Sequence, residues 1–397
     1  MKIARRMRTI EYAIRDVVEV AERVKAKGKT LYHLNIGDPV IFDYDVPKEI
    51  KYALAEAAFE GKNNYVDSRG ILELREVIRK REREQNGIDL DADDVLVTSG
   101  VSEAILFACA ALVETGREIL VPGPCYPPYI TYTRFFDGAP VEYRLSEEDG
   151  WNPDVDDLRR KISDKTNAIL ISSPNNPTGA VYDESIVREM LDLAGEHDLV
   201  VISDEIYDML LFGKSYRCPA SMASDVPVIG MNGFSKAHLS TGWRLGYMYF
   251  HDPEGKIAEL KHYIEKLARV RLCANTPAQY AAVKALEDPG TYTAKMVVKL
   301  KRRRDYCLKR FAELVGVEVV PPQGAFYLFP RVDLRDRWSN DKEFVLDLLE
   351  QTGVVLVYGS GFGSYGAGHF RMVFLPPEET LQTVFDLMED FLAKSGG

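Results

Sequence analysis

The sequence contains few cysteines, and these follow no pattern. Its five cysteines are scattered, odd in number and never spaced as CxxC. A disulfide framework and a cysteine-based zinc site are therefore disfavoured, and free thiols in a reducing cytosol fit this usage better. We expect a cytoplasmic protein without a bound metal.

Long apolar runs and an excess of positive charge are also missing. No apolar run approaches the roughly 20 residues that cross a bilayer. The basic start MKIARRMRTI has no apolar segment typical of a secretory signal. Lys and Arg total 50 and Asp and Glu total 61, which gives a net charge of −11. We therefore expect no membrane partner, and no nucleic-acid partner either, because phosphate backbones need a positive footprint.

The sequence instead shows a long alternation of short apolar runs and amphipathic helical patterns. Helical patterns such as Ser102–Val113 and Glu184–His197 separate the apolar runs. This alternation predicts an α/β fold, with a large domain in which helices sandwich a mostly parallel, seven-stranded sheet. The predicted strands are Val95–Ser99, Ile119–Val121, Val141–Leu145, Ala168–Ser172, Leu199–Ser203, Val228–Met231 and Arg244–Phe250.

The rest of the chain predicts a smaller α+β domain. Short strand patterns follow Gly316, with helices at Asp341–Gln351 and Pro377–Phe391 between and after them. We expect the first residues to pack against this part, so that the smaller domain is built from both chain ends. The predicted division is an N-terminal arm and part of the small domain (1–45), a large cofactor-binding domain (46–290), and a linking helix with the C-terminal small domain (291–397).

Polar residues follow directly after three predicted strands. AILISS leads to Asn176, LVVIS leads to Asp204 and Tyr207, and VIGMN leads to Lys236. Ligands of doubly wound sheets bind outside the carboxyl ends of the strands, so these side chains are expected in one crevice. A desolvated lysine amine attacks carbonyls, and a buried aspartate needs a cation. Pyridoxal 5′-phosphate, with its aldehyde and its ring nitrogen, meets both requirements.

The segments SPNNPTG, SDEIYD and SKAHLSTGWRLG, in that order, resemble the class I and II aminotransferases, which are pyridoxal-phosphate enzymes of fold type I. The resemblance extends from NIGDP near the start to HFRMVF near the end. It implies that Lys236 forms the Schiff base with the cofactor and then moves the substrate proton. It also implies that Asp204 keeps the ring nitrogen protonated, and that Tyr207 and Asn176 hydrogen-bond the phenolic oxygen of the cofactor.

The resemblance further implies a phosphate site. Ser235 and Arg244 would bind the phosphate. The turn Gly100–Val101–Ser102 opens a helix, so its backbone N–H groups would hold the same phosphate, with Val101 acting only through its backbone. A simple helix cap by Ser102 is the alternative interpretation.

Two aromatic residues also match positions of the family. Tyr126 in PGPCYPPY matches the residue that stacks on the pyridine ring, where many members carry tryptophan. Tyr65 in NNYVDSRG matches a tyrosine that reaches the phosphate of the other subunit. The second match implies a homodimer with composite active sites.

The substrate site is expected around Arg371. Arg371 lies in HFRMVF, among apolar residues of a predicted strand, and its planar guanidinium suits the α-carboxylate of an amino acid. The resemblance implies that the backbone of Gly37 and the side chain of Asn176 approach the same ligand, with closure of the two domains over it. Arg15, and Tyr12 one helical turn earlier, are candidates for the distal carboxylate; an ordinary ion pair that anchors the arm is the alternative.

Within the family, RLCANTPAQ, YAIRD and NIGDPVIFDY resemble the alanine aminotransferase branch most. The expected activity is a ping-pong exchange between an L-amino acid and a 2-oxo acid, with alanine and 2-oxoglutarate giving pyruvate and glutamate. Aromatic amino acids, aspartate and branched-chain amino acids are the alternative substrates. A carbon–sulfur lyase on the same fold stays open, as does a non-enzymatic cofactor-sensing module, which would need a DNA-binding domain ahead of it.

Overall fold

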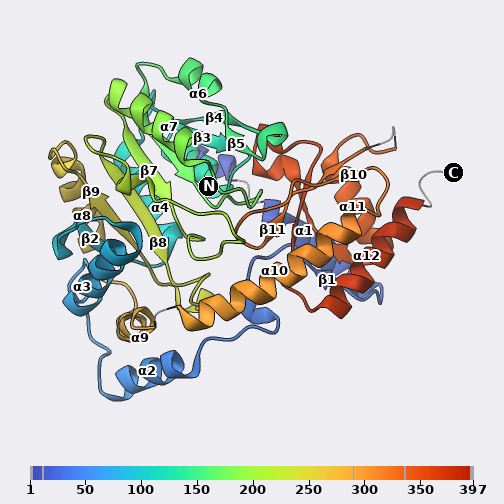
Figure 1. Cartoon of the computed structure of the whole chain (residues 1–397), viewed down its shortest axis with the longest axis horizontal. Coiled ribbons are helices and arrows are strands. Elements are labelled where there is room, and N and C mark those ends of the chain that lie inside the picture. Colours follow the sequence, from blue (N-terminus) through green and yellow to red (C-terminus); the bar gives the residue numbers. More distant parts are fainter. Residues whose placement is uncertain (1–2, 11–12, 289, 335–336, 394–397) are drawn as a thin grey trace.

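One eight-stranded sheet organises the larger part of the molecule (Figure 1). The computed structural model describes residues 3–10, 13–288, 290–334 and 337–393. The strands are β2 (Val95–Thr98), β3 (Glu118–Gly123), β4 (Ala139–Ser146), β5 (Asn152–Pro153), β6 (Thr166–Ser172), β7 (Val200–Asp204), β8 (Val228–Gly233) and β9 (Gly246–His251). Their order across the sheet is β2-β9-β8-β7-β6-β3-β4-β5.

The mostly parallel sheet that the sequence predicts is confirmed. β4, β3, β6, β7 and β8 run parallel to one another, whereas β9 runs antiparallel to both β8 and β2. The two-residue strand β5 extends the seven predicted strands at the β4 edge. The predicted strand boundaries differ from the observed ones by one or two residues, and β9, for example, starts at Gly246 and not at Arg244. Arg244 directly follows the 3₁₀ turn Thr241–Trp243 and has a left-handed backbone (φ 54°). A β-strand needs an extended backbone, so it cannot include this residue.

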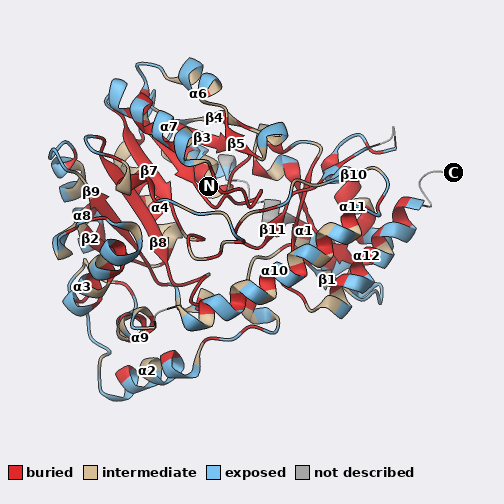
Figure 2. Ribbon diagram, viewed as in Figure 1, coloured by how far each residue is buried: buried red, intermediate tan, exposed pale blue. Residues whose placement is uncertain are grey.

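Helices cover both faces of this sheet. They are α3 (Leu72–Arg81), α4 (Val101–Leu112), α5 (Pro128–Phe135), α6 (Val155–Lys161), α7 (Glu184–Glu196), α8 (Ala258–Arg271) and α9 (Thr276–Leu286), while α2 (Lys48–Phe59) packs outside them against α9. Successive strand residues point to opposite faces, so they enter two separate cores. Leu96 and Ile202 pack with α4, α5 and α8, whereas Val97 and Val201 join a larger core with α7 and α9. Figure 2 shows the strands buried between helices with exposed outer faces.

Both ends of the chain meet in the smaller part of the molecule. Its elements are α1 (Ala13–Ala26), β1 (Tyr32–His33), α10 (Thr291–Phe311), β10 (Val317–Glu318), β11 (Tyr327–Leu328), β12 (Arg331–Val332), α11 (Asp341–Thr352), β13 (Val354–Val355), β14 (Val357–Tyr358), β15 (Phe370–Val373) and α12 (Glu378–Ala393). β1 pairs in parallel with β13, and β15 lies between β11 and β14 in an antiparallel sheet. Figure 1 shows α10 extending from the large sheet toward this part. The α+β character built from both ends is confirmed, and the three domain boundaries stay a prediction.

Two kinds of feature are missing from the residues that the structure describes. No helix in the described ranges combines the length and the apolar character that a membrane span requires. No three His, Cys, Asp or Glu side chains in those ranges come together as ligands for a metal ion. The five cysteines are free thiols.

Candidate active site

A cavity of about 380 Å³ lies where β6, β7 and β8 end. It is lined from both parts of the molecule: the segment Ile36–Asp38, Tyr327 and Arg371 come from the smaller part, and the other lining residues come from the larger one. The structure brings together in its wall Gly37, Val101, Ser102, Tyr126, Asn176, Asp204, Tyr207, Ser235, Lys236, Arg244 and Arg371, all of which the sequence analysis had selected.

Lys236 follows the end of β8 and reaches across to the smaller part. Its Nζ donates a hydrogen bond to the backbone carbonyl oxygen of Gly37 over 2.7 Å. A glycine is required at position 37, because a Cβ there would lie 2.3 Å from Tyr327 Oη. The bare backbone of Gly37 can therefore approach both the lysine and any ligand that the lysine holds.

Burial favours the neutral amine of Lys236. Burial lowers the pKa of Lys236 to about 8, since the ammonium loses its hydration. Asp38 and Asp204 oppose this shift, whereas Arg371 and Arg244 add to it. A substantial fraction of the amine is therefore unprotonated at mildly alkaline pH, as attack on a carbonyl requires.

Asp204 ends β7 and is almost completely buried. Tyr129 Oη donates to Asp204 Oδ2 over 2.5 Å, and the backbone N–H of Ile206 donates to Oδ1 over 3.2 Å. Burial raises the pKa of Asp204 to about 6, although the bond from Tyr129 counteracts part of this rise. A buried carboxylate held by two donors suits a cationic N–H as a further partner.

Arg371 lies on β15, the central strand of the small sheet, with only 1% of its surface exposed. Its Nη1 donates to Asn176 Oδ1 over 2.8 Å, and its Nη2 donates to the carbonyl oxygen of Asn35 over 2.6 Å. The guanidinium carbon lies 4.5 Å from the centre of the Tyr327 ring. These partners are amide oxygens and a ring, so the guanidinium keeps its charge available for an anionic ligand in the cavity.

Tyr207 takes part in a hydroxyl pair. Its Oη lies 2.7 Å from Tyr327 Oη, and both tyrosines are buried. Burial raises the pKa of Tyr207 well above its ordinary value, and the neighbouring Tyr327 adds to the rise. Tyr207 therefore stays a neutral phenol that can donate a hydrogen bond into the cavity.

The amino end of α4 faces the cavity, where Val101 and Ser102 form part of its wall. Gly100 precedes this helix with φ 84°, and a Cβ there would lie 2.8 Å from Arg244 Nη2. The hydroxyl-bearing Ser235 lines the same wall. Helix N–H groups beside a guanidinium and a hydroxyl form a site suited to a phosphate.

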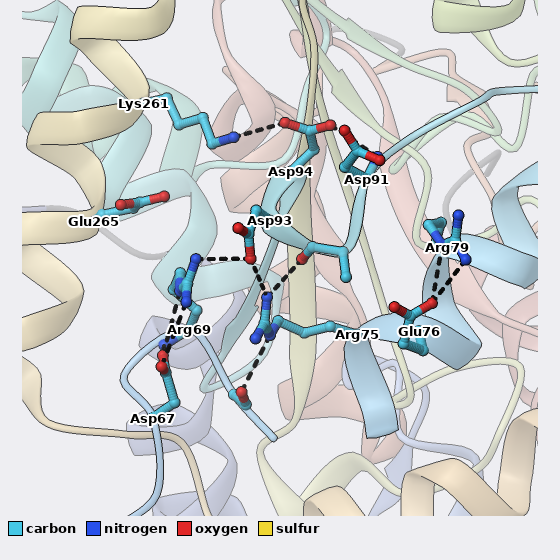
Figure 3. A network of polar contacts seen from close by, with 12 residues as sticks. Asp67, Arg69, Arg75, Glu76, Arg79, Asp91, Asp93, Asp94, Lys261 and Glu265 are labelled. Carbon is cyan, nitrogen blue, oxygen red and sulfur yellow. Dashed lines mark hydrogen bonds and ion pairs between the residues drawn. The ribbon is translucent and has the colours of Figure 1, made fainter. Parts of the chain in front are cut away.

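Tyr65 is not one of the residues that line this cavity. It is 76% exposed, on the loop between α2 and α3. That loop is fixed by ion pairs, in which Arg69 contacts Asp67 and Asp93, and Arg75 contacts Asp93 as well (Figure 3). An exposed tyrosine on an anchored loop fits the predicted role in a partner's site, and that role stays a prediction.

The candidates on the N-terminal arm cannot be placed in the same way. Tyr12 lies outside the described residues. Arg15 belongs to α1, and its side chain also lies outside the description. Their predicted contacts with a distal carboxylate stay predictions.

Several residues of the cavity were missed by sequence reasoning. Tyr129 approaches Asp204 from α5, and the second tyrosine of CYPPY was the one available signal for it. Asp38 accepts a hydrogen bond from Thr241 Oγ1 over 2.9 Å, which ties the NIGDP loop to the segment after Lys236. The lining residues that the sequence analysis did not select are Ile36, Asp38, Tyr129, Ser172, Ile206, Thr241, Gly242 and Tyr327.

The family assignment follows from comparison with known proteins. Residues 29–386 match the family described as aminotransferase class I and II. The chain belongs to this family. As an aminotransferase it is 52% identical to the alanine aminotransferase from Pyrococcus furiosus, whose solved structure aligns over 99% of this chain and 100% of that one with a TM-score of 0.97.

Two curated relatives agree with this assignment. The alanine aminotransferase of Mycobacterium tuberculosis is 36% identical over 396 residues, which cover 98% of this chain and 91% of that protein. The glutamate-pyruvate aminotransferase AlaA of Escherichia coli is 34% identical over 393 residues, which cover 98% of this chain and 97% of that protein. This aminotransferase is therefore a pyridoxal-phosphate-dependent transaminase of fold type I, as the sequence motifs predicted.

The residues of the aminotransferase cavity fit the chemistry of pyridoxal phosphate. Lys236 supplies an amine for the aldehyde, Asp204 a buried carboxylate for the ring nitrogen, and the amino end of α4 with Arg244 a cradle for the phosphate. The cradle has no room for a side chain at Gly246, where a Cβ would lie 2.9 Å from the backbone nitrogen of Val101. When bound, the cofactor supplies an electron sink for the charge that remains after the substrate α-proton leaves.

Proposed function

We propose that this aminotransferase moves an amino group between alanine and 2-oxoglutarate, which gives pyruvate and glutamate. The observation that supports transamination at this site is the meeting of Lys236, Asp204 and Arg371 in one cavity. The alanine assignment is supported by the names of the relatives in Pyrococcus, Mycobacterium and Escherichia.

Each side chain has one task in this proposal. Lys236 would hold the cofactor covalently until the amine of the substrate displaces it, and its freed amine would then take the proton from Cα of the amino acid. Asp204 stays ionised against the protonated ring nitrogen, an ion pair that offsets the cost of burying the carboxylate. Arg371 binds the α-carboxylate of every amino acid and oxo acid, because this group is common to all of them.

The distal carboxylate of 2-oxoglutarate distinguishes the two substrates. Among the described residues of the cavity wall the cations are Lys236, Arg244 and Arg371, and the proposal gives each of them another partner. We assign the distal carboxylate to Arg15 and Tyr12. Alanine, which has only a methyl group, leaves that position to solvent.

We further propose that the active enzyme is a cytoplasmic homodimer in which Tyr65 of one subunit reaches the phosphate held by the other. Exposed apolar side chains near that loop support a second copy as the partner. Phe59 on α2 is 93% exposed, and Val270 on α8 is 85% exposed. Exposed apolar surface of this kind is typical of protein–protein interfaces.

The half-reaction tests the proposed reaction. Purified holoenzyme mixed with alanine alone should convert its cofactor to the aminated form and release one pyruvate per site, without ammonia. A carbon–sulfur lyase would instead act on an amino acid with a sulfur leaving group on Cβ, such as cystathionine, and would release ammonia and pyruvate together with the thiol, without converting the cofactor to its aminated form. A panel of amino donors then tests the substrate: a higher kcat/KM for aromatic, acidic or branched-chain donors than for alanine would reject the alanine assignment.

Reductive trapping tests Lys236 separately. Borohydride reduction of the holoenzyme followed by peptide mapping should place the cofactor label on Lys236. Lys236→Ala should lose transamination while it still binds the cofactor through the phosphate cradle. A label on another lysine, or turnover retained in the variant, would reject this assignment.

A further inference from the structure

Tyr207 and Tyr327 bring phenol groups from the two parts of the molecule into contact at the cavity. The two Oη atoms lie 2.7 Å apart, and the rings meet edge to face with centres 5.7 Å apart. Tyr207 belongs to the segment after β7, and Tyr327 to β11 of the smaller part. A phenol has one proton, so in this pair one hydroxyl donates and the other accepts.

The position of Tyr327 Oη is set from two sides. A Cβ on Gly37 would lie 2.3 Å from this oxygen, so the bare backbone of Gly37 leaves the space that the hydroxyl fills. On the ring face, the guanidinium carbon of Arg371 lies 4.5 Å from the ring centre. A cation over a phenol ring draws electron density from it and makes its O–H a stronger donor.

The direction of the bond follows from the proposed function, on which this inference rests. Tyr207 there donates its single proton to the phenolic oxygen of the cofactor. Its own oxygen is then free to accept, and Tyr327 is the donor within reach. A phenol that accepts one hydrogen bond donates its own more strongly, because the bonds polarise one another.

We propose that Tyr327 is a positioning residue that donates its hydroxyl proton to Tyr207 and so connects the charge of Arg371 to the hydrogen bond that Tyr207 makes with the cofactor. A substrate carboxylate that pairs with Arg371 neutralises the charge over the Tyr327 ring. Tyr327 then donates less strongly, and so does Tyr207. Carboxylate binding is thereby communicated to the cofactor before any bond is formed or broken.

The absorbance of the bound cofactor reports this relay. Weaker donation from Tyr207 leaves the phenolic oxygen more basic, which raises the pKa of the cofactor's titrating proton. The other titratable groups around the cavity are Asp38, Tyr126, Tyr129, Asp204, Lys236 and Arg244, together with Arg371 itself. Tyr327→Phe alters none of them, and it keeps the ring under Arg371.

The experiment is a pH titration of holoenzyme absorbance with and without propionate, which is alanine lacking its amino group. Tyr327→Phe should raise the pH at the midpoint of this titration by roughly 0.5 pH units without propionate. Propionate should then raise the midpoint of the variant less than it raises that of the wild type. Tyr143→Phe is the matched control, because this buried hydroxyl donates to the carbonyl oxygen of Leu170 outside the cavity. The control should titrate like the wild type.

An unchanged midpoint with the full propionate effect in Tyr327→Phe would overturn the relay. A lowered midpoint would overturn it too, because it would mean that Tyr207 donates to Tyr327. A double variant keeps the test independent of small packing changes: in the Tyr207→Phe background, Tyr327→Phe should have no effect on the midpoint. Additive effects in the double variant would contradict the relay.

Two further variants separate this inference from the proposed function. Arg371→Lys should weaken propionate binding, and Tyr207→Phe should raise the midpoint. If either fails, the assigned site is wrong. If both succeed and Tyr327→Phe still titrates like the wild type, only the relay is wrong.

Discussion

Arg371 donates a hydrogen bond to Asn176 over 2.8 Å, although the two residues lie 195 positions apart in the sequence. Arg371 belongs to the small sheet, and Asn176 to the loop that follows β6 of the large sheet. Under the proposed function one of them binds the substrate carboxylate and the other the cofactor. This contact therefore joins the two parts of the molecule at the point where both ligands meet.

Replacing Arg371 by lysine should weaken the binding of all substrates alike. Lysine keeps the charge but loses the planar pair of donors, so we expect kcat/KM to fall roughly 10- to 100-fold for amino acids and oxo acids, mainly through KM. Steady-state kinetics with alanine, glutamate and pyruvate measure this. Arg331→Lys, an exposed arginine of the same part that pairs with Glu318, should leave KM unchanged. A loss confined to glutamate would mean that Arg371 binds the distal carboxylate.

The pH dependence of cofactor capture should reflect the lowered pKa of Lys236. With that pKa at about 8, the rate of covalent capture by the cofactor-free protein should rise with pH and level off above about pH 9. Stopped-flow absorbance measures the rate. A rate that still climbs steeply at pH 10 would indicate an ordinary exposed lysine.

Asp38 provides a matched variant for this measurement. Its carboxylate raises the pKa of Lys236, so Asp38→Asn should move the midpoint of the capture rate to lower pH. Asparagine can still accept the hydrogen bond from Thr241, which keeps the loop in place. An upward shift would contradict the electrostatic explanation.

The residues at strand ends could be placed from the sequence alone. Asn176, Asp204 and Lys236 each follow an apolar run, and parallel strands bring their carboxyl ends to one edge of a sheet. Arg371 was predictable for a different reason, because a guanidinium among apolar strand residues needs an anion. These inferences need only local pattern and the general geometry of parallel sheets.

Residues that act through tertiary contacts could not be found in that way. Tyr129 reaches Asp204 from a helix 75 positions earlier, and Tyr327 reaches Tyr207 from 120 positions later. In the sequence both are ordinary aromatic residues with apolar neighbours. Arg244 shows the opposite case: its residue type was selected correctly, but its left-handed backbone carries no sequence pattern.

The buried carboxylate of Asp204 should cost stability in the cofactor-free protein. Its pKa is raised to about 6 from 3.8, so the folded state holds this proton more tightly than the unfolded state does. The resulting stabilisation is present below about pH 4 and is lost as the pH rises to about 6. The free energy of unfolding of Asp204→Asn should therefore rise by roughly 3 kcal/mol relative to that of the wild type across this interval.

Urea unfolding of both cofactor-free proteins between pH 4 and pH 8 tests this expectation. A difference between them that does not vary with pH would contradict it. Tyr129→Phe gives a second check on the same carboxylate. It removes a donor that lowers the pKa of Asp204, so the pH interval over which stability falls should extend to higher pH.

Subunit complementation should reveal whether Tyr65 completes a partner's site. Tyr65→Ala should weaken cofactor binding, and Lys236→Ala should abolish turnover. In a hybrid dimer of these two variants, one site combines the wild-type Lys236 of one subunit with the wild-type Tyr65 of the other. The mixture, after dissociation and reassembly, should therefore regain tight cofactor binding and activity in that one site.

The control variant is Tyr52→Ala, which replaces an exposed tyrosine on α2. Paired with Lys236→Ala, it should give no gain beyond its own activity. If the Tyr65→Ala mixture shows only the average of the two parent proteins, Tyr65 does not act across the interface.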